Sequence, residues 1–394
     1  MSHALFVHAH AAHADWRVAL AECQRQVQAQ IAARAAQQDK SAQFTLGWCY
    51  LSDYYAPASE AIVHELQRAL PGVAWIGTVG VGVVANGVEY IDEPALVLMV
   101  APLPRDSFRI FSGRQPLPAT SSGFVPHTAL VHAEGGTPDL QELLHELSAR
   151  TATGYLFGGL SSARNRPLHI ADGVFTGGLS GVLFGPEVGL ISRVTQGCQP
   201  IGPVRTITQA KHNLVITLDG KPALDCVLDD LGLDRDLPTD TLSQALSTTL
   251  AGLSIGAEDV PKRPGTFGTD TLVRHLVGVD PKHRALEVAD LAEPGMHLAF
   301  CTRSPEAALV DLVRIATEIR AELECGTAGH MSGALYVSCS GRGGPHFGAR
   351  HAELQTVRNA LGDVPLVGFF AGGEIARNHL YGYTGILTVF TSRD

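Results

Sequence analysis

The residues best suited to chemistry lie in a glycine-rich loop near the C-terminus and in a turn that follows it. The loop SCSGRGGPHFG supplies hydroxyls, a thiol, a guanidinium and an imidazole, and the turn AGGEIA supplies a carboxylate. Such side chains, together with the free backbone amides of a glycine-rich loop, can converge on a small anionic ligand. The sequence therefore predicts a ligand-binding site with these members: Ser338, Cys339, Ser340, Arg342, His346, Gly373 and Glu374.

Cys339 has two further interpretations. A thiol near Arg342 and His346 can act as a nucleophile, because a lowered thiol pKa generates the thiolate. Alternatively, Cys339 is a buried and unreactive core residue, since the sequence alone does not show that His346 reaches it. We prefer ligand binding to catalysis and expect no enzymatic activity.

Another glycine-rich motif is better explained by a turn between strands than by nucleotide binding. The stretch GVGVVA fits one form of the dinucleotide fingerprint, but Asn86-Gly87 and another strand pattern follow it where a helix is required. Asn-Gly between two strand patterns is typical of a hairpin. The sequence contains no GxxxxGK[ST] phosphate loop.

Histidine and cysteine residues that could bind a metal or haem are present, but their spacing matches no metal-binding or haem-binding motif. The chain has 17 histidines and 7 cysteines, without a CxxC pair. If the segment around His8 and His10 is a strand, the two side chains share a face by simple alternation. Cys198 is of a type that binds soft metals or haem iron, although a core position is the simpler interpretation. We expect no metal and no obligatory cofactor, with haem as the alternative.

Periodicity indicates the elements that position these residues. Short runs rich in β-branched and aromatic residues alternate with segments whose apolar residues recur at helical spacing. Helices are expected over residues 62–70, 140–147, 309–323 and 354–361. The pattern predicts an α+β protein with mixed or antiparallel sheets flanked by helices.

The chain also contains an internal repeat. The segment from Val73 matches the segment from Val364 without a gap, at an offset of 291 residues (364 − 73), and glycines align at several positions. Each copy reads strand, loop, helix, strand, glycine turn, strand, and a looser copy follows residue 128. We infer two homologous halves built from repeated β-α-β-β units, with domains at 1–220 and 221–394. The acidic, turn-rich segment LDDLGLDRDLPTD, residues 228–240, is expected to be a surface connection near this boundary.

Composition excludes several functions. The net charge of -10 and pI of about 5.9 give no basic surface for nucleic acid or anionic lipid. No stretch approaches the ~18 apolar residues of a spanning helix, and the N-terminus has no secretory pattern. The sequence therefore predicts a cytoplasmic protein.

The region from Gly333 to Phe390 resembles the C-terminal FIST domain, on the motifs CSGRG and GFFAGGE. VAWIGTVG, YLFGGLSS and TQGCQPIGP in the first half are similar to the FIST N-terminal domain. The resemblance implies a sensory, small-ligand-binding protein of bacterial signalling, proposed to recognise compounds such as amino acids. Some members bind haem, sense nitric oxide and regulate histidine kinases or cyclic-di-nucleotide enzymes.

This chain departs from the family in two respects. It carries no F-box, kinase, cyclase or transmembrane sensor region, so its output requires a separate signalling partner. Val83 stands where the second repeat has Glu374, which argues against two equivalent ligand sites.

The leading hypothesis is a sensor whose ligand lies between the two halves, with Arg342 binding a carboxylate and Glu374 an ammonium group. The alternatives are a haem-based nitric-oxide sensor, a cysteine-dependent enzyme using Cys339, and a pure interaction scaffold.

Overall fold

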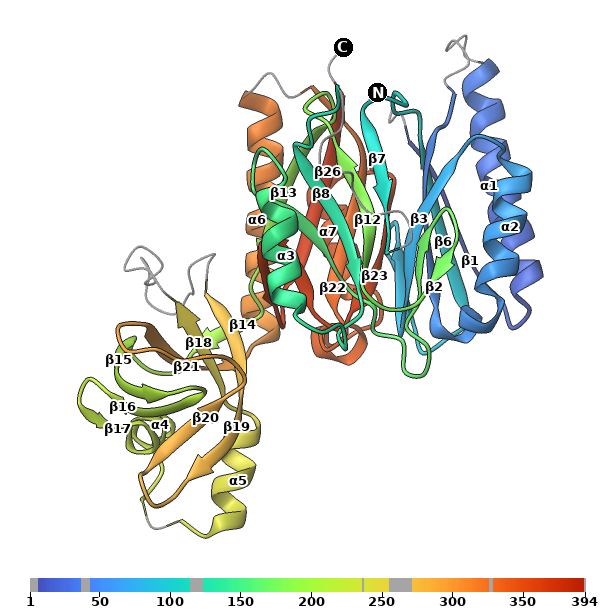
Figure 1. The fold of residues 1–394 in the computed structure, drawn as a ribbon. Coiled ribbons are helices and arrows are strands. Elements are labelled where there is room, and N and C mark those ends of the chain that lie inside the picture. Colours follow the sequence, from blue (N-terminus) through green and yellow to red (C-terminus); the bar gives the residue numbers. More distant parts are fainter. Residues whose placement is uncertain are drawn as a thin grey trace. The chain divides into compact units, whose positions relative to one another are not determined.

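The computed structural model describes residues 6–36, 43–113, 123–235, 237–254, 271–325 and 329–392. These residues form two compact units (Figure 1). Unit 1 comprises residues 1–195 and 309–394, and unit 2 comprises residues 196–308. Both halves of the sequence therefore contribute to unit 1.

Unit 1 contains three mixed sheets, whose strand orders are β1-β6-β2-β3-β10-β11, β7-β12-β8-β9-β24-β25 and β13-β26-β22-β23-β4-β5. The strands are β1 (Val7–Ala12), β2 (Leu46–Ser52), β3 (Ala74–Gly80), β4 (Gly82–Ala85), β5 (Val88–Ile91), β6 (Ala95–Ala101), β7 (Phe108–Phe111), β8 (Thr128–Ala133), β9 (Leu156–Leu160), β10 (His169–Ala171), β11 (Val174–Phe175), β12 (Leu179–Phe184), β13 (Gly189–Thr195), β22 (His330–Cys339), β23 (Leu366–Ala371), β24 (Glu374–Arg377), β25 (His379–Tyr381) and β26 (Gly385–Ser392). The accompanying helices are α1 (Trp16–Ala36), α2 (Ser59–Ala69), α3 (Leu140–Ala149), α6 (Pro305–Cys325) and α7 (Ala352–Leu361), with short 3-10 helices η1 (Asp53–Ala58) and η3 (Gly344–Phe347).

Each sheet is built on the same unit. Two parallel strands are joined by a crossover helix, as in β2-α2-β3, β8-α3-β9 and β22-α7-β23. The strands β6, β12 and β26 then return antiparallel to the first strand of their unit. The predicted α+β class, with repeated β-α-β-β units in mixed sheets flanked by helices, is confirmed. The looser copy after residue 128 is a complete third unit.

In each copy, the chain that follows the second parallel strand forms a hairpin that pairs with another sheet. The β4–β5 hairpin pairs with β23, β10–β11 pairs with β3, and β24–β25 pairs with β9. Each sheet is therefore completed by strands from a different copy. The two halves of the sequence therefore interlock in unit 1, because β4, β5 and β13 of the first half share a sheet with β22, β23 and β26. Residue 220 itself lies in unit 2.

One glycine in each copy is required by the close approach of a neighbouring strand. A Cβ at Gly77, Gly158 or Gly368 would lie 1.8, 1.9 or 1.7 Å from the carbonyl oxygen of the adjacent parallel strand. Real Cβ atoms never come so close to backbone, so these positions accept only glycine. The aligned glycines of the repeat are explained by this contact.

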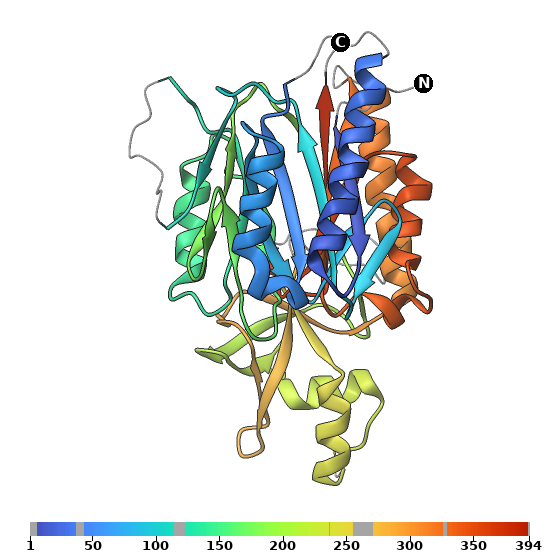
Figure 2. The ribbon, with the colours of Figure 1, turned by 90° about the vertical axis from the view of Figure 1, so that its right-hand side faces the viewer.

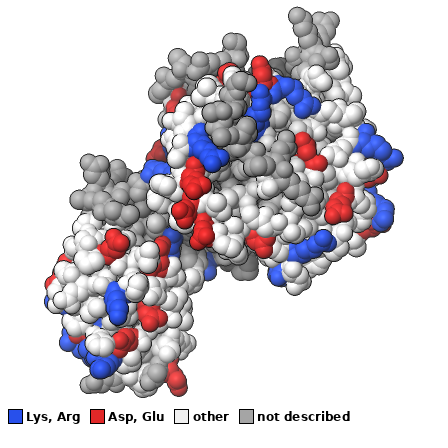
Figure 3. Space-filling view, viewed as in Figure 1, with Lys and Arg blue, Asp and Glu red and all other residues white. Residues whose placement is uncertain are grey.

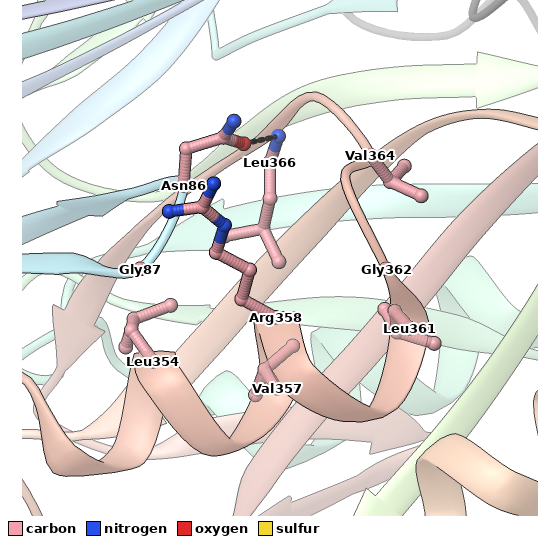
Figure 4. Close-up of a pocket in the computed structure, with 9 residues that line it drawn as sticks. All are labelled: Asn86, Gly87, Leu354, Val357, Arg358, Leu361, Gly362, Val364 and Leu366. Atoms are coloured by element: carbon pink, nitrogen blue, oxygen red, sulfur yellow. Dashed lines mark hydrogen bonds between the residues drawn. The ribbon is translucent and has the colours of Figure 1, made fainter.

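A glutamine on each crossover helix holds the exchanged hairpin. Gln67, Gln141 and Gln355 donate to the backbone oxygens of Asp172, Asn378 and Gly87, at 3.0, 2.7 and 2.9 Å. In the Asn86-Gly87 turn, Asn86 Oδ1 also accepts from Leu366 N at 2.9 Å, beside a small apolar pocket against α7 (Figure 4). The predicted Asn-Gly hairpin is confirmed, and it is the element exchanged.

The helices of unit 1 lie on the outside of the sheets (Figure 2). Helices α1 and α2 cover one apolar cluster, α6 and α7 cover a second, and α3 covers a third. The inward faces of the sheets pack through aromatic rings. Tyr50 stacks on Phe369 at 5.0 Å between centroids, and Trp48 lies 5.2 Å from Phe390. The four expected helices are confirmed as α2, α3, α6 and α7.

Unit 2 is antiparallel throughout its described part. Its elements are β14 (Cys198–Pro200), β15 (Arg205–Lys211), β16 (Leu214–Leu218), β17 (Lys221–Pro222), α4 (Ala223–Leu231), α5 (Thr239–Ser247), β18 (Leu250–Ser254), β19 (Leu272–Asp280), β20 (Ala285–Val288) and β21 (His297–Arg303). β21, β15, β16, β20, β19 and β18 pair in a closed ring, because β18 also pairs with β21. Helix α4 packs into the core of this barrel through residues 223–228, and the described residues 229–235 after that buried stretch are partly or fully exposed.

Candidate ligand-binding site

A buried ionic cluster lies behind the predicted loop. Glu353, in the first turn of α7, accepts hydrogen bonds from Tyr336 Oη at 2.7 Å, Ser338 Oγ at 3.0 Å and Arg342 Nε at 2.9 Å. The side chains of Arg342 and Glu353 are 1% and 0% exposed. The Glu353 carboxylate thus connects strand β22, the loop and helix α7 by hydrogen bonds.

Arg342 is already engaged by the protein. Burial acts to lower the pKa of its guanidinium, but the Glu353 carboxylate raises that pKa and keeps the group charged. Its Nη2 has no hydrogen-bond partner. A ligand can reach Arg342 only if the loop opens, because the side chain is 1% exposed.

Glu374 is the first residue of the exchanged strand β24 and is fully buried. Its Oε2 accepts from Thr384 N at 3.1 Å and from Thr384 Oγ1 at 2.8 Å, whereas Oε1 has no partner. Burial raises the pKa of Glu374 to about 8, against the opposing effects of Thr384 and of the Arg342 charge. The Glu374 carboxyl therefore holds its proton more tightly than a solvent-exposed glutamate does.

Cys339 lies beside Glu374 at the end of β22. Burial raises the pKa of its thiol to about 12, and the nearby Glu374 carboxylate contributes in the same direction. A thiolate is needed for nucleophilic attack. The surroundings of Cys339 therefore keep it a protonated thiol and argue against the nucleophile interpretation.

The remaining predicted residues occupy different positions. Ser340 is exposed in the loop, and His346 is half-buried on η3 with its ring 5.1 Å from that of Phe347. The carbonyl of Gly373 accepts from Leu160 N at 2.8 Å and belongs to the hairpin exchange. The structure thus brings Ser338, Cys339, Arg342 and Glu374 together in a buried cluster, with Ser340 and His346 on the loop outside it.

A groove of about 430 Å³ lies next to this loop, within unit 1. Its walls come from both halves of the sequence. The first half contributes the β5 hairpin strand and the segment after it, and the second half contributes the loop and the residue before α7. The lining residues are Glu89, Ile91, Asp92, Glu93, Gly344, Arg350 and His351.

Glu89 ties the two walls together. This carboxylate is 3% exposed and accepts from Leu354 N at 3.2 Å and Gly344 N at 3.5 Å, at the N-terminus of α7. The Glu89 amide donates to Nδ1 of His351 at 2.9 Å. Burial raises the pKa of Glu89, and the backbone amides oppose that rise. The positive end of the helix dipole also favours the carboxylate here.

Two opposite charges face each other in the groove. Arg350 Nη2 lies 2.9 Å from Glu93 Oε1, with side-chain exposures of 75% and 33%. Asp92 contributes a second carboxylate, which lies 2.7 Å from Arg164. Unlike the buried cluster, these groups meet solvent.

Sequence reasoning missed the groove residues. The Asn86-Gly87 signal places Glu89 and Glu93 on and after a hairpin, but the pairing of that hairpin with β23 depends on a contact between residues far apart in sequence. Only the nearby acids Glu89, Asp92 and Glu93 carried a signal that could have found them.

The surface charge, the possible metal ligands and the helix hydrophobicity bear on which kinds of ligand the protein can bind. On the face shown in Figure 3, acidic and basic side chains are interspersed without a continuous basic surface. In the described part of the chain, no group of three or more His, Cys, Asp or Glu side chains could hold a metal ion. Nor do the described helices include one with the length and apolarity to cross a membrane.

The comparisons with known proteins define the class. The FIST N domain model matches residues 45–221, and the FIST C domain model matches residues 223–377. The chain therefore belongs to the FIST family, a family of sensory domains.

Two similar proteins come from mycobacteria. An uncharacterized protein of Mycobacterium tuberculosis is 30% identical over 345 residues, covering 84% of this chain and 86% of the relative. An uncharacterized protein of Mycobacterium bovis is 29% identical over 348 residues, with the same coverage of 84% and 86%.

Proposed function

We propose that this protein is a small-ligand sensor that binds an amino-acid-like ligand in the groove between β5 and the start of α7. The observation that carries the proposal is the exposed pair of Glu93 and Arg350, which places a carboxylate and a guanidinium on opposite walls. A zwitterionic ligand has the complementary charges at a similar separation.

A ligand can replace the Glu93–Arg350 ion pair at a small cost in free energy. An exposed ion pair such as Glu93–Arg350 contributes about 0–1 kcal/mol, so opening it costs little. The ligand carboxylate can form two parallel hydrogen bonds with the fork of Arg350. The ligand ammonium then takes the place of Arg350 beside Glu93, with Asp92 as the second carboxylate on the same wall.

The residues predicted from the sequence have a supporting role in this proposal. The Arg342–Glu353 pair fixes the loop that ends in Gly344, and Glu89 fixes that loop to the hairpin. Ligand binding between two such walls can alter the loop that carries Ser340 and His346. We place this sensor in the cytoplasm, with its output passing to a separate kinase or cyclic-di-nucleotide enzyme.

The test is a thermal-shift screen of the purified full chain against amino acids and their one-charge analogues. For a stabilising amino acid, the corresponding amine and the corresponding carboxylic acid are each expected to give a smaller rise in Tm. Arg350→Gln should remove the response to the amino acid and to the acid, and Glu93→Gln the response to the amino acid and to the amine.

Arg25→Gln is a matched control, because Arg25 forms an exposed pair with Glu22 on α1, at 2.6 Å. That variant should respond as the wild type does. The proposal fails if no amino acid stabilises the wild type, or if Arg350→Gln and Glu93→Gln respond normally. A Soret band after addition of haemin would support the haem alternative instead.

A further inference from the structure

Unit 1 has a second, larger cavity that the proposed function does not use. It has a volume of about 520 Å³ and lies where the C-terminal ends of β6 and β26 approach β13 and the start of β22. This volume is in the range of pockets that hold small organic ligands. The cavity shares no lining residue with the groove at Arg350.

One wall of this cavity is a preformed aromatic surface. The Phe6 amide donates to Ser332 O at 3.2 Å, and Arg34 Nη2 donates to Phe6 O at 2.6 Å, so the backbone of Phe6 is fixed on both sides. Its ring lies against Gly333, where a Cβ would be 2.2 Å from the ring, and 5.2 Å from the ring of Phe390. A ligand meets this wall without first ordering it.

The opposite walls are apolar and rich in proline. Pro102, Leu103 and Pro104 follow β6, and Pro186 and Val188 precede β13. Proline lacks a backbone donor and has a fixed φ angle, so these segments present carbon surface with little conformational freedom. Apolar area buried against them stabilises a complex by roughly 25 cal/mol per Å².

Two features define the polar end of the ligand. Ser332 Oγ is buried and has no hydrogen-bond partner in the structure. The charged residues that line the cavity, within the described part of the chain, are Glu187 and Glu322. Glu322 is paired with Arg193 at 2.5 Å, on α6 and β13 respectively. Glu187 is therefore the lining carboxylate with no ion pair among the described residues, and the unused hydroxyl of Ser332 can accept a hydrogen bond.

We infer that this cavity binds a small apolar amine in its ammonium form, such as an alkylammonium or arylalkylammonium ion. The hydrocarbon part packs between the Phe6 wall and the proline segments. The ammonium group donates to Ser332 Oγ or lies beside Glu187, where a carboxylate ligand of the same shape is repelled. This specificity differs from that of the groove at Arg350, where a carboxylate on the ligand strengthens binding.

The experiment uses the full chain and a neutral fluorescent arylamine, N-phenyl-1-naphthylamine, whose emission rises in apolar sites. Octylammonium, octanol and octanoate are then titrated as competitors below their micelle concentrations. Octylammonium is expected to displace the probe at about tenfold lower concentration than octanoate, with octanol between them. Equal displacement by octanoate and octylammonium would overturn the inference, as would a probe that does not bind.

Variants locate the site. Leu103→Trp fills the cavity and should weaken probe binding at least tenfold, whereas Val310→Trp, at an exposed α6 position outside the cavity, should leave it unchanged. Glu187→Gln should abolish the preference for octylammonium over octanol while the probe still binds, which shows that the protein remains folded. The inference is wrong if Leu103→Trp and Val310→Trp bind the probe equally. Arg350→Gln should bind the probe normally, so this result does not depend on the proposed amino-acid site.

Discussion

The first and second repeats share a strand-turn-strand pattern but carry their acids in different places. The strand before each turn contains a glycine in close contact with a neighbouring strand, Gly77 in β3 and Gly368 in β23. In the second copy the acid Glu374 follows the turn and is bound by Thr384. The equivalent positions in the first copy, at the offset of 291, are Val83 and Glu93.

The acid of the second copy serves the structure, whereas the acid of the first copy is available to a ligand. In the second copy the carboxylate is buried at the start of β24 and satisfied in part by the protein itself. In the first copy the core position is apolar, and the acid Glu93 lies instead on the groove, opposite Arg350. A repeated fold thus offers two versions of one turn, of which the first contributes a solvent-facing charge.

The crossover helices show the same contrast and give the largest expected effect. Glu353 on α7 corresponds to Glu65 on α2, in the shared Glu-Leu-Gln sequence. Glu353→Ala leaves Arg342 buried without its carboxylate and should lower the free energy of unfolding by about 3–5 kcal/mol. The side chain of Glu65 is 34% exposed and paired with Arg68. Glu65→Ala should therefore lower the free energy of unfolding by at most about 1 kcal/mol. Urea denaturation of both variants checks this, and equal losses would contradict it.

The shared glycines should respond alike in both copies. Gly77→Ala and Gly368→Ala each force a Cβ into a backbone carbonyl that cannot move without shifting a central strand. We expect a loss of about 3 kcal/mol in each variant. Gly362→Ala is a useful contrast: no atom lies within 4 Å of its added Cβ, so its cost comes from the positive φ of 88° alone. A much smaller loss in Gly77→Ala than in Gly368→Ala would show that the two turns are not equivalent.

The buried acid of the second copy should make stability depend on pH. Burial raises the pKa of Glu374 from 4.5 to about 8, so the folded state binds its proton more tightly than the unfolded state. This contribution is fully present below pH 4.5 and is lost as the pH rises through about 8, by at most about 1.4 kcal/mol per pH unit. Glu374→Gln removes this slope. Denaturation from pH 5 to 9 should therefore show the stability of wild type falling relative to that of the variant, and parallel curves would contradict the assignment.

The sequence predicted local structure well because its signals were local. Helical spacing marked α2 and α7, Asn86-Gly87 marked a hairpin, and the matching segments from Val73 and Val364 revealed a repeat. Which sheet receives that hairpin depends on strand pairing between residues hundreds of positions apart, for which composition and spacing contain no signal. For the same reason, the pairing of β18 with β21 that closes the barrel of unit 2 has no local signal in the sequence.

The candidate site was predicted only in part. Two side chains of the predicted set, Ser338 and Arg342, meet at the carboxylate of Glu353, to which both donate. Their burial could not be read from residue type, because Glu and Arg are usually exposed unless they are paired. Glu93 and Arg350 lacked any motif, and they become neighbours only through the hairpin exchange.

The exposed pair of the first copy gives the smallest expected effect on stability. A double-mutant cycle with Glu93→Gln and Arg350→Gln should give a coupling energy of about 0.2–1 kcal/mol, because solvent screens both charges. Added salt should reduce this coupling further. The same variants should each abolish the rise in Tm caused by an amino acid. Glu93 and Arg350 would then contribute little to stability but be essential for ligand binding. A coupling of several kcal/mol would mean instead that Glu93 and Arg350 are structural like Glu353 and Arg342, and the contrast between the two copies would disappear.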